Sequence, residues 1–161
     1  MPLQNCRGIA ASRAMMVRTA RLEDAPQVLR LIRDHAQYEG GRASIEQNVL
    51  ERLLQIEEPP VRILVAESDQ IAGYAALTTD YSLWSGACYG HLDCLFVAKE
   101  YRGTGVGQKL FLKVREEAHA AGCVRLEWQT PDWNRQATEF YRRNGAECLS
   151  KTRFILQLDA A

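Results

Sequence analysis

The stretch YRGTGVGQKL, residues 101–110, places three glycines within five positions, just before apolar residues that recur at helical spacing. Gly103, Gly105 and Gly107 permit positive φ angles and a close approach of a ligand to the main chain. The N–H groups that open a helix bind anions, because the helix dipole is positive at that end. The stretch predicts a phosphate-binding turn between a strand and a helix, with a purely structural tight turn as the alternative.

The spacing does not fit the two commonest nucleotide-binding loops. A Walker loop requires Gly-Lys after four intervening residues, but Lys109 follows Gln108. A dinucleotide fingerprint requires glycine at its sixth position, which is Gln108 when the count starts at Gly103. A nucleotide-binding or kinase-like function is therefore disfavoured.

The composition is that of one globular domain. The chain has 161 residues, of which 47% are apolar and 25% charged, and its formal net charge is zero. A neutral chain has no global field for nucleic acid or an anionic membrane, and no apolar run approaches the roughly 18 residues of a membrane span. We expect residues 1–16 to be a disordered extension and residues 17–161 to form a single domain.

The cysteines are odd in number and scattered, and the three histidines are dispersed as well. This pattern argues against a disulfide framework and against a metal site, and it favours free thiols in the reducing cytoplasm. The cysteines are Cys6, Cys88, Cys94, Cys123 and Cys148.

Periodicity predicts an α/β or α+β fold with one mixed sheet. Helices are expected from Asp24, as a possible N-cap, to Gly40, from Ser44 to Ile56, from the glycines to Gly122, and over 134–145 with Asn134 as N-cap. Strands are expected at 17–19, 61–67, 71–78, 91–97, 124–129 and 152–158. In 91–97, strict alternation would put Leu92, Cys94 and Phe96 on one face and Asp93, Leu95 and Val97 on the other.

The segment Arg102 to Gly107 matches the R/Q-x-x-G-x-G/A signature of the GNAT family of N-acetyltransferases. With WNRQATEFYRRNGA (133–146) and the order of elements, the resemblance extends from about Val17 to Leu158. LIRDHAQYE (31–39) and LFVAKEYRGTGVGQKL (95–110) resemble the diamine and polyamine (spermidine/spermine-type) branch. The resemblance implies the GNAT fold, a mostly antiparallel sheet flanked by helices, acetyl-CoA as cofactor without a metal, and a homodimer.

The resemblance also implies which residues bind the cofactor. The glycine turn would bind the pyrophosphate, the main chain of the preceding strand would stabilise the oxyanion, and the last helix would contact the pantetheine arm. These residues are Leu95, Phe96, Val97, Arg102, Gly103, Thr104, Gly105, Val106, Gly107, Gln108, Asn134, Arg135, Gln136, Ala137 and Tyr141.

Acetyl transfer to an amine requires a neutral amine and a proton for the departing thiolate. An alkyl ammonium has a pKa near 10.4, so holding it neutral at pH 7 costs roughly 4–5 kcal/mol. Asp93 is the expected base, directly or through a water, and the resemblance implies Tyr141 as the acid. The substrate site would comprise Tyr38, Glu39, Asp93, Glu127, Trp128 and Gln129. The alternatives are that Asp93, Glu39 and Glu127 are solvated surface carboxylates and that the aromatic residues belong to the core.

The expected reaction is transfer of acetyl to a primary amine of a small cationic molecule, by direct attack in a ternary complex. Lys151 lies near the position where the branch carries a further acidic residue, which argues against long polyamines. A protein or peptide amine, an aminoglycoside, and a non-catalytic acyl-CoA-binding role remain as alternatives.

Overall fold

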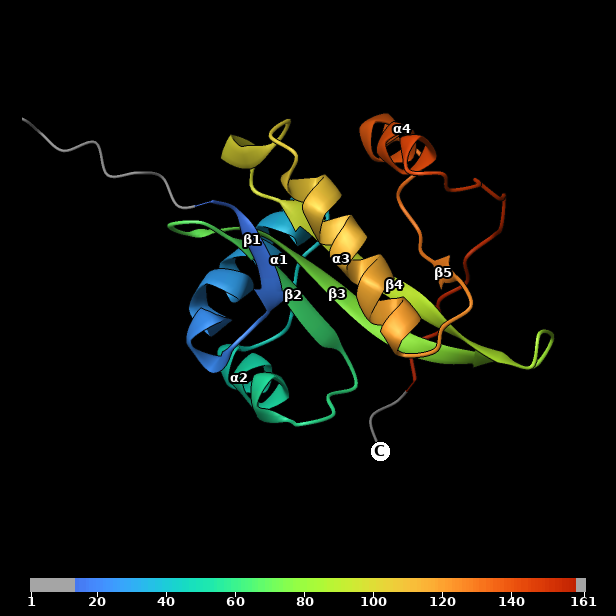
Figure 1. Ribbon diagram of the computed structural model, residues 1–161, viewed down its shortest axis with the longest axis horizontal. Helices are drawn as coiled ribbons and strands as arrows, with labels where there is room; N and C mark the ends of the chain where they lie inside the picture. The colour runs from blue at the N-terminus through green and yellow to red at the C-terminus, as the bar shows by residue number, and fades with distance from the viewer. Residues whose placement is uncertain (1–13, 159–161) are drawn as a thin grey trace, which may run out of the picture. The chain divides into compact units, whose positions relative to one another are not determined.

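The computed structural model describes residues 14–158, which divide into two compact units, a first unit up to Trp128 and a second unit from Gln129 (Figure 1). Each unit is described by itself. Most of the expected N-terminal extension, residues 1–13, lies outside the described residues. Met16 already belongs to the first strand, one residue before the expected start of that strand.

The first unit contains a five-stranded sheet in the order β1-β2-β3-β4-β5. Neighbouring strands from β1 to β4 are antiparallel, and β5 is parallel to β4. The predicted mixed, mostly antiparallel sheet is confirmed. The strands are β1 (Met16–Thr19), β2 (Arg62–Glu67), β3 (Ile71–Ser82), β4 (Ala87–Val97) and β5 (Leu126–Glu127).

Helices cover both faces of this sheet (Figure 1). Consecutive residues of β3 show the two layers: the Tyr74 hydroxyl meets His35 of α1, whereas a Cβ at Gly73 would lie 3.2 Å from Leu110 of α3. The helices of this unit are α1 (Ala25–Tyr38), α2 (Gln47–Gln55) and α3 (Val106–Ala120), with short 3-10 turns at Leu22–Asp24 and Lys99–Tyr101.

The sequence placed the first two helices correctly, and Asp24 occupies the expected N-cap position of α1, but its side chain makes no capping hydrogen bond to that helix. Asp24 precedes α1, yet its carboxylate accepts hydrogen bonds from Arg18 of β1 and from the Arg21 amide rather than from α1. The half-buried Arg18 competes successfully for this buried carboxylate, since a bond between two charged groups is stronger than one from an uncharged amide. The second helix begins at Gln47 with Glu46 at the N-cap position, three residues after the expected start at Ser44.

The strand β4 contains a bulge that the sequence did not predict. Cys94 pairs with Ala76 of β3, but Leu92 pairs with the next residue, Leu77, which leaves Asp93 as the extra residue. The bulge reverses the alternation. Leu92 therefore faces the side opposite to Cys94 and Phe96, and the expectation that all three share a face is wrong.

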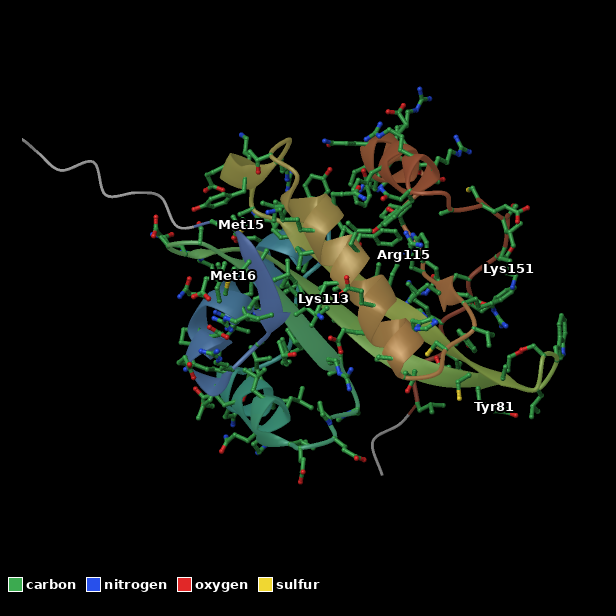
Figure 2. The ribbon with its side chains drawn as sticks, in the orientation of Figure 1. Met15, Met16, Tyr81, Lys113, Arg115 and Lys151 are labelled. Carbon is green, nitrogen blue, oxygen red and sulfur yellow. The ribbon has the colours of Figure 1, made fainter. Side chains whose placement is uncertain are left out.

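Strands β3 and β4, which form a hairpin, are both longer than predicted. The expected ranges were 71–78 and 91–97, but pairing continues to the Ser82 and Ala87 pair. Tyr81 lies in the extended part, near the hairpin turn (Figure 2). The added residues include polar and exposed ones, so periodicity of apolar residues did not reveal them.

The C-terminal strands differ most from expectation. The segment 124–129 contains only the two-residue β5, and residues 146–158 form no helix or strand, so the strand expected at 152–158 is wrong. Apolar alternation yields a strand only where a neighbouring strand supplies hydrogen-bond partners. Lys151 lies in this stretch (Figure 2). Its large apolar side chains are exposed, namely Leu149, Phe154, Ile155, Leu156 and Leu158.

The second unit contains one helix, α4 (Arg135–Arg143), among its described residues. The predicted N-cap is confirmed, because the Asn134 side chain accepts a hydrogen bond of 3.1 Å from the Ala137 amide. Gly145 follows the helix with a φ of 84°, as a glycine just past a helix end does.

Candidate active site

The glycine turn joins the sheet to the N-terminus of α3. Gly103 and Gly105 have φ angles of 76° and 86°, and Gly105 is the N-cap of α3. Gly107 instead lies in the first turn of the helix. The first helical bond runs from the Lys109 amide to the Gly105 carbonyl, so the helix opens directly at the turn.

Space in front of this turn is open. A Cβ added at Gly103 or Gly105 would have no heavy atom within 4 Å. The Thr104 hydroxyl is directed back to the Tyr101 carbonyl at 2.6 Å, and Val106 is buried in the core. The main chain, rather than the side chains, is therefore what this turn presents, which fits an anionic group held by backbone N–H donors.

Strand β4 has a free edge beside the turn within the described first unit. Its pairing with β5 is confined to Gly90 and His91. The Ala98 amide donates to Ala72, toward β3, and successive strand residues point their N–H and C=O groups to alternate sides. The main chains of Leu95 and Val97 therefore point to the free edge.

Phe96 has the opposite orientation. It pairs with Tyr74, its carbonyl lies against Gly73, and its side chain belongs to the core. Of the three residues expected to offer main-chain donors, the structure thus presents Leu95 and Val97 to a ligand and uses Phe96 to hold the sheet.

Arg102 folds back on its own unit. Its Nε donates to the Val97 carbonyl at 3.0 Å, and its guanidinium lies 4.7 Å from the ring centre of Tyr38 and 5.2 Å from that of Phe96. Arg102, Tyr38 and Phe96 line a cleft of about 610 Å³ between α1 and the segment that follows β4. Arg102 thereby fixes the start of the glycine turn to α1.

The charges of two acidic residues far apart in sequence act on one half-buried imidazole. His35 of α1 lies 3.3 Å from the Glu39 carboxylate and 3.0 Å from the Tyr74 hydroxyl. Burial lowers the pKa of His35, while the charges of Glu39 and Asp93 act in the opposite direction. The imidazole is therefore neutral at neutral pH, and both carboxylates direct their negative potential to the same region.

Asp93 is presented by the bulge of β4. Its side chain is exposed, and the Cys94 thiol approaches its carboxylate at 3.5 Å. Burial raises the pKa of Cys94 to about 12, with the Asp93 charge contributing. A thiol with this pKa stays protonated at neutral pH, so Cys94 is a poor nucleophile.

The residues of β5 show a different arrangement. Glu127 forms an ion pair with Arg125 at 2.6 Å, which supports its alternative role as a surface carboxylate. Trp128 packs edge-on against Phe111 of α3, with ring centres 5.5 Å apart. Gln129 is exposed at the start of the second unit.

The remaining expected residues lie in the second unit. Arg135 and Gln136 are exposed in the first turn of α4, and Ala137 is half-buried. Tyr141 is half-buried and packs edge-on against Phe140, with ring centres 5.2 Å apart. The opening of α4 thus presents main chain and polar side chains, a surface suited to a polar arm of a ligand.

Comparison with known proteins identifies the family. The profile of the acetyltransferase (GNAT) family matches residues 26–146, across both units. The chain belongs to the GNAT acetyltransferase family. GNAT proteins use acetyl-CoA as acyl donor, and the protein is accordingly an acyltransferase.

Two curated GNAT relatives and one solved structure illustrate the similarity. Thialysine N-epsilon-acetyltransferase from Bos taurus is 34% identical over 150 residues, which cover 85% of this chain and 86% of that protein. Spermidine/spermine N(1)-acetyltransferase-like protein 1 from Homo sapiens is 26% identical over 83% of this chain and 21% of its own. An aminoglycoside acetyltransferase from an uncultured soil metagenomic sample superposes with a TM-score of 0.74 at 21% identity, covering 90% of this chain and 97% of its own, and so supports the GNAT fold.

The sequence interpretation did not identify the group formed by His35, Glu39 and Tyr74. His35 falls within a predicted helix, and Tyr74 and Cys94 fall within predicted strands. The spacing of His35 and Glu39 by four residues was the available signal, because such residues are neighbours on a helix. Nothing in the sequence indicated that Tyr74 would complete the group.

Two general properties bear on function. None of the helices in residues 14–158 is long and apolar enough to cross a membrane. Those residues also contain no group of three His, Cys, Asp or Glu side chains that could hold a metal ion.

Proposed function

We propose that the protein transfers acetyl from acetyl-CoA to a primary amine of a small cationic acceptor, such as a diamine or a thialysine-like amino acid. The observation that carries this proposal is the pair of carboxylates that act on the half-buried His35: Glu39, 3.3 Å from its Nε2, and Asp93 of β4, the strand with the free edge. Two carboxylates in one region attract a dication more strongly than a monocation. The thialysine acetyltransferase relative supports the same class of acceptor.

The donor side rests on the glycine turn and the free edge of β4. Backbone N–H donors at residues 103–108 would hold the pyrophosphate of the cofactor, with the positive end of the α3 dipole behind them. The main chains of Leu95 and Val97 would align the pantetheine arm, and one of their N–H groups would stabilise the carbonyl oxygen as negative charge develops. The cofactor would supply the thioester, and the main-chain groups of these residues would hold it in position for attack by the amine.

The acceptor side rests on the acidic residues. Asp93 would attract the ammonium group and accept its proton, directly or through a water, which leaves a neutral amine. Glu39 and Tyr38 would hold the other cationic end. Glu127, Trp128 and Gln129 would border the acceptor, although the ion pair with Arg125 makes Glu127 the weakest member of this set.

The second unit would complete the reaction. Asn134, Arg135, Gln136 and Ala137, at the start of α4, would contact the pantetheine arm. Tyr141 would donate the proton to the departing thiolate, a role proposed from the motif WNRQATEFYRRNGA and tested in the Discussion. Direct attack in a ternary complex is consistent with the protonated state of Cys94.

We further propose a cytoplasmic location and a homodimer. The four cysteines in the described residues are free, which is consistent with the cytoplasm. A homodimer is proposed by family analogy, and the exposed apolar side chains at 154–158 would be covered by such an interface. The molar mass in solution, measured by light scattering, tests the dimer.

The experiment for function is acetyl-CoA turnover with a panel of amines: a diamine, thialysine, an aminoglycoside and a peptide with a free N-terminus. We expect the highest kcat/KM with the diamine or thialysine. Turnover with the peptide alone would overturn the acceptor class. Binding of coenzyme A without turnover of any amine would favour the acyl-CoA-binding alternative.

A further inference from the structure

His35 is held on three sides in the first unit. Its Nδ1 lies 3.0 Å from the Tyr74 hydroxyl, its Nε2 lies 3.3 Å from the Glu39 carboxylate, and its ring stacks on Phe96 with centres 5.0 Å apart. Stacking fixes the plane of the imidazole, and the two polar contacts fix the directions of its nitrogen atoms within that plane. The ring therefore has one orientation, set by α1, β3 and β4 together.

The polar contacts also define the tautomer. An ionised carboxylate only accepts hydrogen bonds, so Nε2 must carry the proton that is donated to Glu39. In a neutral imidazole Nδ1 is then an acceptor, and the Tyr74 O–H donates to it. Burial raises the pKa of Tyr74, so its hydroxyl keeps the proton that this bond requires.

The charge state of His35 matters for Glu39. A protonated imidazole would form an ion pair with Glu39 and cancel the charge that a cationic ligand needs. Burial lowers the pKa of His35 and so prevents this at neutral pH. The other charged groups that act on the ring are Asp93 of β4 and Arg102 after β4, and the two have opposite signs. Tyr74 and Cys94 are the remaining titratable neighbours, and both stay protonated.

Resting on the proposed function, we propose that His35 is a positioning residue for acceptor specificity: as a neutral donor it holds the Glu39 carboxylate toward the second cationic group of the acceptor. Tyr74 selects the tautomer that makes this possible. A lysine or arginine at this position would orient the carboxylate but neutralise it. A neutral imidazole orients it and leaves its charge available, which explains why a histidine is placed between a carboxylate and a buried phenol.

Kinetics of matched amines test the role. With 1,4-diaminobutane and saturating acetyl-CoA, His35→Leu is expected to raise KM about tenfold while kcat stays within about twofold, since one hydrogen bond to a charged group is lost. The value of kcat/KM for n-butylamine, which has no second charge, is expected to stay unchanged. His35→Gln, whose amide can replace the Nε2–H donor, is expected to restore most of the affinity for the diamine.

The pH profile provides a second readout. As the pH falls below the ordinary histidine range near 6.5, protonation of His35 is expected to raise KM for 1,4-diaminobutane more than for n-butylamine. His35→Gln has no such ionisation and should lose this difference between the two amines. An equal effect of His35→Leu on both amines, or failure of His35→Gln to differ from it, would overturn the proposal.

A spectroscopic test separates this proposal from the proposed function. The chain has three histidines, so ¹⁵N-labelled imidazole signals can be assigned by single substitutions. We expect His35 to be the Nε2–H tautomer in the wild type and to become a tautomer mixture in Tyr74→Phe. If no diamine is acetylated but this pattern is found, the acceptor assignment fails and the positioning geometry stands. An Nδ1–H tautomer in the wild type would show that His35 does not donate to Glu39 and would overturn the positioning proposal.

Discussion

The guanidinium of Arg102 lies over the ring of Tyr38, 4.7 Å from its centre, while its Nε donates to the last carbonyl of β4 at Val97. One side chain thus joins the C-terminal end of α1 to the start of the glycine turn. Tyr38 belongs to the expected acceptor site and the turn to the expected cofactor site, so Arg102 couples the placement of both.

Replacing Arg102 is therefore expected to affect both ligands. Arg102→Ala should destabilise the protein by about 1–2 kcal/mol, through loss of the hydrogen bond and the cation–π contact, and should raise KM for acetyl-CoA and for the amine. Arg102→Lys should restore little, because an ammonium lacks the planar group that stacks and donates together. Urea unfolding and steady-state kinetics measure these effects. Lys99→Ala, at an exposed cation nearby, is the control, and an equal response of the two positions would contradict the coupling role.

The glycine turn offers a sharper comparison. Gly105→Ala should cost about 1–2 kcal/mol of stability, because a residue with a Cβ disfavours the left-handed backbone found there. The added methyl group would also occupy the open space before α3, so stabilisation of the protein by coenzyme A should fall markedly. Gly122→Ala is the matched control, since Gly122 has a φ of 77° and equally open surroundings at the other end of α3. Thermal shift should show the same loss of stability in both variants and a loss of coenzyme A response in Gly105→Ala alone.

Tyr141→Phe tests the proposed acid. Removing one hydroxyl should lower kcat by at least about tenfold, since general acid catalysis contributes factors of this size or larger, while the affinity for coenzyme A stays nearly unchanged. Tyr81→Phe, in the exposed part of the β3–β4 hairpin, is the control for loss of a phenol. Wild-type turnover in Tyr141→Phe would remove this residue from the mechanism.

The ion pairs of Arg18 predict the acid stability of the first unit. Burial by itself would raise the pKa of Asp24, but hydrogen bonds from Arg18 and from the Arg21 amide outweigh it and hold the pKa below its ordinary value. Because the folded-state pKa is depressed, this contribution is present above about pH 4 and is lost as the pH falls through the folded-state value. Asp24→Asn should lower the free energy of unfolding by about 2 kcal/mol at pH 7 and flatten its dependence on pH below 4.

The exposed pair of Arg21 and Glu23, 3.8 Å apart, provides the control for that measurement. Glu23→Gln should change the free energy of unfolding by less than about 0.5 kcal/mol. A dependence on pH that is unchanged in Asp24→Asn would show that other carboxylates govern acid unfolding.

The sequence by itself determined the elements whose signals are local. Positive φ at Gly103 and Gly105, the cap of α4 by Asn134, and the hairpin between β2 and β3 each depend on a few adjacent residues. The order of these elements, with the glycine signature, was enough for the family and for a mixed sheet. Local backbone preferences and short-range hydrogen bonds do not require a tertiary partner, so they can be read directly.

Tertiary structure decided what depends on pairing between distant segments. The bulge at Asp93 arises from the register of β4 against β3, and it turns Leu92 to the opposite face from Phe96. His35 meets Tyr74 only because α1 packs on that face of the sheet. Residues 152–158 have the alternation of a strand but form none, since a strand exists only when another strand accepts and donates its hydrogen bonds. Apolar alternation shows that a segment could form a strand with one buried face. Whether a neighbouring strand is there to pair with it depends on the tertiary fold.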